Sequence, residues 1–290
     1  MKRLLIILTC LAAIALIWYN HISDHDGLTP FNQRGITTSP SLVSSGLHFD
    51  GINDYVEIPD NDLLAFSNEL SFECWIKPEA TDHNHIVTKQ YCANHQYSFS
   101  LFLHNGKLKF AFDEDGICNA ATSPVSIYSM DEGAVKTGVW QHVALTYSTA
   151  GAHFYVNGKE CPGTLTGNYT SIYNSISPLR IGGYQLGTAE LTNFYQGMMC
   201  EFRSWNYARS REEIQAQMFT RLEGNESGLV LYYAFDGGMV DSDNTNAFNL
   251  SDKTANHLNG RLQNFSLRDK RSNWTGSIVD EFDNLKKPGN

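Results

Sequence analysis

Apolar residues that alternate on both sides of an Asn-Gly pair limit the possible folds of this chain more than any other feature. They occupy every second position around Asn105 and Gly106, at Phe99, Leu101, Leu103, Leu108, Phe110 and Phe112. Asn-Gly favours the two-residue turn of a β-hairpin. The register of such a turn pairs His104 with Lys107, then Leu103 with Leu108, Leu101 with Phe110, and Phe99 with Phe112. The segment is therefore predicted to be a hairpin with one apolar face.

Short runs of the same kind recur from residue 46 to residue 206. They are rich in Tyr, Phe, Val and Ile and are separated by Gly, Asn, Asp and Pro. A second meander is predicted from 139–147 back through 153–156 to Asn157-Gly158, with further strands at 179–181 and 198–205. This pattern is typical of an antiparallel sandwich or barrel.

The periodicity changes near residue 210. Ser210 and Glu213 have the spacing of a capping box, and Ile214 and Met218 lie one helical turn apart, which predicts a short helix at 211–219. A strand is predicted at 229–235. We expect the extension 221–276 to pack on the sandwich, because this strand is too apolar to stand alone. The polar tail 277–290 is expected to be flexible.

An apolar run near the N-terminus predicts export. Lys2 and Arg3 precede the run 4–18, and Asp24 and Asp26 follow it, which predicts an N-inside orientation. As a helix the run would span roughly 22 Å, less than the ~30 Å hydrocarbon core. Residues 1–19 are therefore either a signal-anchor helix or a cleaved signal peptide, and 20–45 a polar linker. The rest of the chain is expected outside the cytoplasm, anchored in the first case and secreted or periplasmic in the second.

Charge and cysteine content limit the kinds of partner that the chain can bind and the chemistry of its cysteines. The net charge of -10, from 21 basic and 31 acidic side chains, argues against nucleic acid as the main partner and suits Ca²⁺ or neutral ligands better. The six cysteines form no Cys-x-x-Cys pair, so disulfides are expected rather than a zinc site. Cys92 and Cys118 lie at the open end of the predicted hairpin, one step out of register. A disulfide between them is predicted, worth about 3 kcal/mol in the chain-entropy model.

Seven segments, in order, resemble laminin-G-like, concanavalin A-like jelly-roll domains. The first reads Leu-His-Phe-Asp-Gly-Ile-Asn-Asp-Tyr-Val-Glu-Ile-Pro, and the others include Trp75, Trp140, Asn157-Gly158, Trp205 and Arg209; together they are residues 47–59, 72–78, 138–144, 155–158, 179–182, 197–210 and 228–236. The resemblance implies an all-β, two-sheet antiparallel jelly-roll sandwich over 46–220 with one short helix, here preceded by the N-terminal hydrophobic helix. It also implies a structural calcium ion and sugar-binding roles as frequent features of such domains.

Asp50, Asn53 and Asp54 are the candidate calcium ligands, because hard oxygen donors are clustered in one tight loop. Glu201 is a distant carboxylate that could complete the shell. The alternative is that Asp50 and Asn53 hydrogen-bond their own turn. Cys200 stands where the resemblance leads one to expect an acidic residue. The resemblance also implies a Cys74–Cys200 disulfide, which would leave Cys161 unpaired.

Exposed aromatic rings are the usual stacking surfaces for sugars. Four tyrosines in the loop-rich segment before the last predicted strand are the candidate ligand-binding residues: Tyr169, Tyr173, Tyr184 and Tyr195. In a chain this rich in aromatic residues, the alternative is that they fill the core or its edge.

Catalytic signatures are weak. A jelly-roll glycanase needs two carboxylates on one strand face, but the pair Asp113 and Asp115 is followed by Gly116 and has the pattern of a turn. His83 and His85 could share a metal with His95, although loop histidines are common. The leading hypothesis is a non-catalytic module that recognises a glycan or glycoprotein, with Ca²⁺ holding a loop. A structural or adhesive protein-binding module is the first alternative, and a glycan hydrolase the second.

Overall fold

A computed structural model describes residues 45–91, 95–117, 125–185 and 191–276. The predicted N-terminal anchor, linker and C-terminal tail lie outside these residues, as do both cysteines of the predicted Cys92–Cys118 disulfide. Within the described ranges, no helix is both long enough and apolar enough to cross a bilayer.

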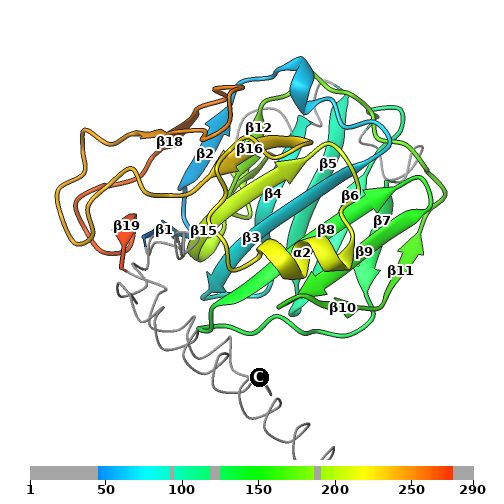
Figure 1. The fold of residues 1–290 in the computed structure, drawn as a ribbon, viewed down its shortest axis with the longest axis horizontal. Helices are drawn as coiled ribbons and strands as arrows, with labels where there is room; N and C mark the ends of the chain where they lie inside the picture. Colours follow the sequence, from blue (N-terminus) through cyan, green and yellow to red (C-terminus); the bar gives the residue numbers. More distant parts are fainter. Residues whose placement is uncertain (1–44, 92–94, 118–124, 186–190, 277–290) are drawn as a thin grey trace, which may run out of the picture. The chain divides into compact units, whose positions relative to one another are not determined.

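Two large antiparallel sheets make up the body (Figure 1). The first sheet has the order β10 (Lys159–Cys161), β9 (Gly151–Val156), β8 (Gln141–Ser148), β3 (Leu70–Pro78), β15 (Gln196–Trp205), β1 (Gly46–Asp50) and β19 (Asn273–Thr275), with β16 (Leu229–Tyr233) also paired to β15. The second has the order β11 (Gly163–Thr166), β7 (Ser126–Met130), β6 (Lys107–Phe112), β5 (Gln96–His104), β4 (Asn84–Tyr91), β12 (Leu179–Ile181), β2 (Tyr55–Ile58), β18 (Gly260–Gln263) and β17 (Asn249–Leu250). The all-β class with two antiparallel sheets is confirmed.

Three smaller elements complete the described residues. They are the single-turn helix η1 (Asp62–Leu64), the helix α2 (Arg211–Gln217) and the small hairpin of β13 (Tyr184–Gln185) and β14 (Leu191–Thr192). The hairpin predicted from Asn105-Gly106 is β5–β6, and its register is the predicted one, from His104 opposite Lys107 to Phe99 opposite Phe112. Its apolar face lies in the core, where Phe99, Leu101 and Phe110 are at most 2% exposed.

Helix α2 begins at the predicted capping box. The Ser210 hydroxyl accepts from the Glu213 amide at 3.2 Å, and the Glu213 carboxylate accepts from the Ser210 amide at 2.7 Å. The helix ends at Gln217, two residues before the predicted end. Ile214 packs against Ala144 of β8 and Tyr155 of β9, which fixes the helix on the outer face of the first sheet (Figure 1).

Buried charges connect α2 to the sheet beneath it. Arg209 is paired with Glu73 of β3 and with the side chain of Gln217. His142 of β8 lies 3.4 Å from the same glutamate. Burial alone would raise the pKa of Glu73, but the hydrogen bond from His142 and the charge of Arg209 lower it. The carboxylate of Glu73 is therefore ionised within the protein interior.

The segment after residue 220 supplies strands to both sheets. β16 pairs with β15 and β19 with β1 in the first sheet, while β18 pairs with β2 in the second. β16 ends at Tyr233 rather than at the predicted residue 235, and Phe235 has a φ of 57°, outside the range of regular strand backbone.

The Cys74–Cys200 disulfide implied by the resemblance is not formed, and both residues are buried free thiols. The register places Cys200 opposite Trp75, and a bulge follows between Cys200 and Arg203. Cys200 is therefore one residue out of register with Cys74, although both side chains lie in the same core. Burial raises the pKa of both thiols.

Candidate functional site

A polar pocket of about 540 Å³ lies at the rim of the sandwich, where β1 ends. Three segments that are far apart in the sequence line it: the β1–β2 turn, the start of β15 and the loop between β18 and β19. The lining residues are Asp50, Gly51, Ile52, Gln196, Asn264, Ser266, Asp269, Arg271 and Ser272. We call this the rim pocket.

The turn that forms one wall requires a glycine. Asp50 is paired with Gln196 across β1 and β15, and Gly51 follows with a φ of 75°. A Cβ at Gly51 would lie 2.7 Å from the Cβ of Gln196, closer than two such atoms can approach. The Asp50 carboxylate accepts from the amides of Ile52 and Asn53 at 2.8 and 3.2 Å. This is the Asx turn that sequence reasoning kept as the alternative to a calcium site.

Asp54 is a fully buried carboxyl beside this turn. One of its oxygens accepts from the Asp50 amide and the other from the Ser272 hydroxyl, both at 3.0 Å. Burial is the largest influence on this group and raises its pKa to about 7. Asp54 therefore joins the first turn of the fold to the β18–β19 loop. Near neutral pH, both its protonated and its ionised forms are populated.

Ion pairs flank the rim pocket on the side of β3. Arg271 lies 3.5 Å from Glu79, and Glu79 also accepts from His48 at 2.8 Å and from Gln196 at 3.3 Å. Partial burial alone would raise the pKa of Glu79, but the hydrogen bond from His48 and the charges of His48 and Arg271 lower it. These contacts position Arg271, whose side chain is 69% exposed, at the mouth of the pocket.

The predicted calcium ligands are only partly brought together. Asp50, Asn53 and Asp54 share the turn, but Glu201 lies five residues along β15 from the partner of Asp50, which is roughly 17 Å of strand. Glu201 is buried against Arg203 at 3.0 Å and accepts from the Tyr232 hydroxyl at 2.7 Å. Glu201 lies in the bulge after Cys200 and has a φ of 53°.

The predicted tyrosines occupy different environments. Tyr195 is fully buried in the core against Phe49, and Tyr169 is half-buried against the core. Tyr173 is half-buried and packs over Gly116. Tyr184 is half-buried and packs on the ring of His85, with a centroid separation of 4.3 Å. Of the four, Tyr184 has the best position to present a ring on the outer face of the second sheet.

Two aromatic residues that sequence reasoning missed lie between Tyr184 and the rim pocket. Tyr55 and Phe194 have ring centroids 6.4 Å apart, and both are half-buried. Tyr55 lies opposite Gln263 of β18, one residue before Asn264 of the pocket. The sequence did contain a signal for Tyr55. It directly follows Asp54 in the segment that resembles the family and precedes the apolar Val56, and strand neighbours point to opposite faces.

A family model decides what this chain is related to. The model described as the concanavalin A-like lectin/glucanases superfamily matches residues 50–215, more than half of the chain. The chain belongs to this superfamily. The resemblance found in the sequence is thereby confirmed. A search of curated proteins gave no match.

Solved structures are similar to this chain at low sequence identity. A Bacteroides ovatus protein provisionally described as carbohydrate binding has a TM-score of 0.54 and 20% identity, over 77% of this chain and 58% of that one. The CBM40 module of a Ruminococcus gnavus IT-sialidase bound to α2,3 sialyllactose has a TM-score of 0.45 and 13% identity, over 61% and 98% of the two chains. Mouse laminin α1 domains LG4-5 have a TM-score of 0.43 and 17% identity, over 63% and 48%. The chain thus spans less than two thirds of the Bacteroides protein.

Asp113 and Asp115, the carboxylates considered for hydrolysis, are part of a turn. Asp113 accepts from the amides of Asp115 and Gly116 at 3.0 and 3.2 Å, and Asp115 accepts from Ile117 at 2.8 Å. Asp113 is fully buried, and burial is the main cause that raises its pKa to about 6. Both side chains therefore stabilise the local backbone.

Replacement of Asp113 by Asn tests this structural role. The folded state binds the Asp113 proton more tightly than the unfolded state, whose pKa is near 3.8, so the free energy of unfolding falls as the pH rises between about 4 and 6. Asn keeps the acceptor oxygen but has no proton to lose. Across this window the wild type should lose on the order of 2 kcal/mol relative to Asp113→Asn. Urea unfolding of both proteins at several pH values measures the difference, and parallel pH profiles would contradict the prediction.

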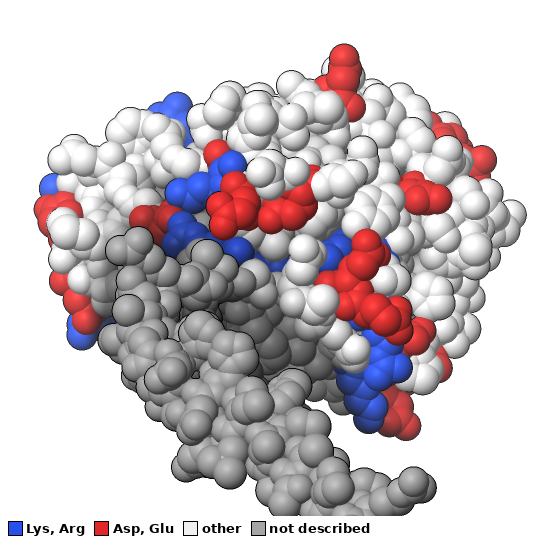
Figure 2. All heavy atoms as spheres, in the orientation of Figure 1, with Lys and Arg blue, Asp and Glu red and all other residues white. Residues whose placement is uncertain are grey.

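Charges of both signs are interspersed over the face shown in Figure 2, where red and blue side chains lie next to one another. The described residues on this face therefore present no continuous basic surface.

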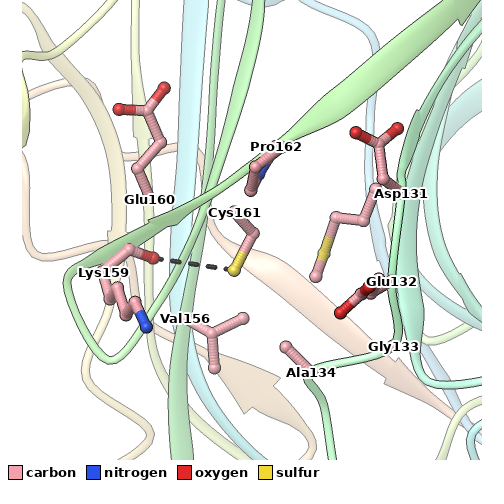
Figure 3. Close-up of a pocket in the computed structure, with 10 residues that line it drawn as sticks. Asp131, Glu132, Gly133, Ala134, Val156, Lys159, Glu160, Cys161 and Pro162 are labelled. Carbon is pink, nitrogen blue, oxygen red and sulfur yellow. Dashed lines mark hydrogen bonds between the residues drawn. The ribbon is translucent and has the colours of Figure 1, made fainter.

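A second cleft of about 540 Å³ lies between the ends of β7 and β10. Figure 3 shows the Cys161 thiol turned towards the Lys159 carbonyl, with Val156 and Ala134 nearby; the Sγ to oxygen distance is 3.7 Å. Cys161 is a half-buried free thiol, and burial raises its pKa.

Alkylation should distinguish the three described thiols. In the native protein we expect iodoacetamide to modify Cys161 first, because Cys74 and Cys200 are each only 2% exposed and react only after unfolding. Peptide mapping by mass spectrometry over time measures the order. In denaturant all three should react at similar rates. Native labelling of Cys74 at the rate of Cys161 would contradict this arrangement.

Proposed function

We propose that this chain is a non-catalytic recognition module that binds a carbohydrate or glycoprotein through the rim pocket. The observation that carries the proposal is the convergence of amide, carboxylate, hydroxyl and guanidinium groups from three distant segments in one cavity. Sugar hydroxyls are both donors and acceptors, and binding pockets of this size use a few such groups to orient a ligand. Membership of a superfamily that contains lectins, and the likeness of fold to the Bacteroides protein, support this ligand class.

The aromatic rings beside the pocket support the same ligand class. Tyr55, Phe194 and Tyr184 continue the outer surface from Asn264. An aromatic ring offers an apolar face to the C–H groups of a pyranose, while the pocket offers hydrogen bonds. A glycan of more than one sugar unit would engage both.

Calcium remains part of the proposal, with Asp50, Asn53 and Asp54 as its ligands. A cation beside the buried Asp54 would favour the ionised carboxylate, which burial alone disfavours. Glu201 is not included, because it is paired with Arg203.

The matched variants Arg271→Ala and Arg268→Ala test the site. Both side chains lie in the β18–β19 loop, are 69% and 70% exposed, and lie 3.5 Å from a carboxylate, but only Arg271 lines the rim pocket. A glycan array should show binding by the wild type and by Arg268→Ala, and at least a tenfold loss of affinity for Arg271→Ala. Equal binding by both variants would rule out the rim pocket as the site.

Three further measurements separate the alternatives. Loss of binding with a chelator, restored by calcium, supports the metal, and unchanged binding excludes it. Release of reducing sugar would favour a glycan hydrolase. An array without any bound glycan would contradict the proposal and favour a protein-binding adhesive module.

We further propose that residues 4–18 carry the module out of the cytoplasm and, if uncleaved, anchor it. The basic residues before this run and the acidic residues after it favour that orientation. Protease added to cells with an intact cytoplasmic membrane, after any outer membrane has been permeabilised, should then degrade the sandwich. Full protection until the cytoplasmic membrane is disrupted would contradict export from the cytoplasm.

A further inference from the structure

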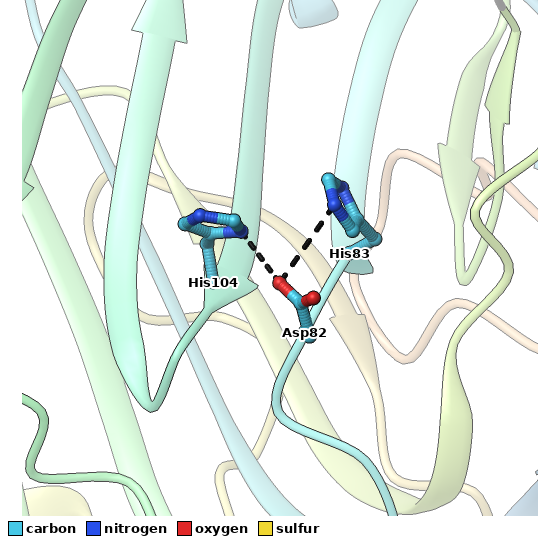
Figure 4. A group of neighbouring side chains, drawn as sticks. All are labelled: Asp82, His83 and His104. Carbon is cyan, nitrogen blue, oxygen red and sulfur yellow. Dashed lines mark ion pairs between the residues drawn. The ribbon is translucent and has the colours of Figure 1, made fainter.

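Two histidines and one aspartate meet where β4 begins and β5 ends (Figure 4). His104 Nδ1 lies 2.6 Å from Asp82 Oδ1, and His83 Nε2 lies 3.8 Å from the same oxygen. One donor atom from each of the three side chains lies within 4.8 Å of the other two. Figure 4 shows both imidazole rings turned towards the carboxylate.

The backbone holds these three residues in place from two sides. Asn84 pairs with Leu103 across β4 and β5, which places His83 and His104 at the next step of the same ladder. The Gly106 amide in the following turn donates to the Thr81 carbonyl at 3.2 Å. The segment before β4 is therefore tied to the β5–β6 turn, and the donors stay close together without a ligand.

This group differs from the one that sequence reasoning considered. His85 is 5% exposed, its ring stacks on Phe102 at 4.9 Å, and its Nδ1 is 2.9 Å from the Ser100 hydroxyl. Burial lowers the pKa of His85 to about 3. His85 is therefore committed to the outer face of the sheet, and its place beside His83 is taken by His104 and Asp82.

The donor set suits a transition metal rather than calcium. Imidazole nitrogen and carboxylate oxygen are ordinary ligands of Zn²⁺, whereas Ca²⁺ prefers oxygen alone. Ligand distances of about 2.0–2.1 Å in a tetrahedral site put donor atoms about 3.3 Å apart. The observed 2.6 and 3.8 Å bracket that spacing, and the two histidine donors lie within 4.8 Å of each other, so modest side-chain shifts would close the site. Asp82 and His83 are more than half exposed, which makes such shifts inexpensive and leaves a path for the ion.

We propose that Asp82, His83 and His104 bind one divalent transition-metal ion, for which zinc is the probe. Three protein donors leave one tetrahedral position open to solvent, as in zinc sites that exchange a ligand. The site is separate from the rim pocket and does not depend on glycan binding.

Zinc titration of the full chain by isothermal calorimetry tests the proposal. We expect one equivalent of zinc to bind the wild type with at least tenfold higher affinity than His83→Ala or His104→Ala. His153→Ala is the matched control, because His153 also lies 2.7 Å from a carboxylate, that of Glu160, and is similarly exposed at 57%. It should keep the wild-type stoichiometry and affinity.

Two results would overturn the site. One is zinc binding by the wild type that is unchanged in the double variant His83→Ala/His104→Ala, since the metal would then lie elsewhere. The other is that the wild type binds no zinc. Circular dichroism of each variant shows that it is folded, and His104→Gln provides a second, milder change if His104→Ala unfolds.

Discussion

Replacing Arg209 with methionine is expected to destabilise the protein by about 3–5 kcal/mol, because it leaves the Glu73 carboxylate buried without its main partner. Arg209 is 3% exposed, and it also stacks over Trp205 at 4.1 Å and reaches Gln217 at the end of α2. Methionine fills part of the volume but supplies no charge. The loss is a large share of the roughly 5–15 kcal/mol of a typical domain. Urea unfolding followed by tryptophan fluorescence measures it.

Arg211→Met is the control for this prediction. Arg211 is exposed in the first turn of the same helix, so its replacement should change the free energy of unfolding by less than about 0.5 kcal/mol. The double variant Glu73→Met/Arg209→Met should cost less than Arg209→Met alone, because no unpaired carboxylate remains. A double variant less stable than the single one would show that Glu73 has a separate stabilising role.

Trp274→Ala is expected to cost about 3–5 kcal/mol by opening a cavity under the first sheet. Trp274 is 1% exposed, lies in β19 opposite Leu47 of β1, and belongs to the main core. It is packed so closely over Gly238 that a Cβ there would lie 2.0 Å from Trp274 Cδ1. Loss of this side chain should therefore loosen β1 and the C-terminal segment together.

Phe248→Ala is the matched control, since Phe248 is an aromatic residue of the same C-terminal segment but is 47% exposed. Its free energy of unfolding should stay within about 1 kcal/mol of the wild type. If Trp274→Ala lowered the free energy of unfolding as little as Phe248→Ala, β19 would not share the core. Thermal unfolding by calorimetry compares the two.

Local pattern was sufficient for part of the fold. The β5–β6 register followed from Asn105-Gly106, because a two-residue turn determines which side chains face each other. The start of α2 followed from Ser210 and Glu213, because the contacts of a capping box span only three residues. The bulge after Cys200 could not be predicted, since it depends on how β15 pairs with β3 and β16 at once. The Cys74–Cys200 pairing failed because β3 and β15 pair Cys200 with Trp75, and Glu201 lies apart from Asp50 because it is five residues further along β15.

The candidate site divides in the same way. The Asx turn of Asp50 was a stated alternative, because its acceptor and donors are within three residues of each other. Asp269, Arg271 and Ser272 were missed, since nothing in a loop over 200 residues away signals contact with that turn. The partnership of His83 with His104 was missed because it requires the β4–β5 register, and residues between those strands include no short turn signal.

The amino-acid sequence by itself determined several of the strands, where the short helix α2 begins, the register of the Asn-Gly hairpin and the superfamily. These follow from side-chain periodicity and turn chemistry, which act over a few neighbouring residues. Only the tertiary structure decided which distant segments meet: Asp54 with Ser272 across 218 residues, and Trp274 with Leu47. Such contacts depend on packing both sheets against one core, a condition that no single segment carries.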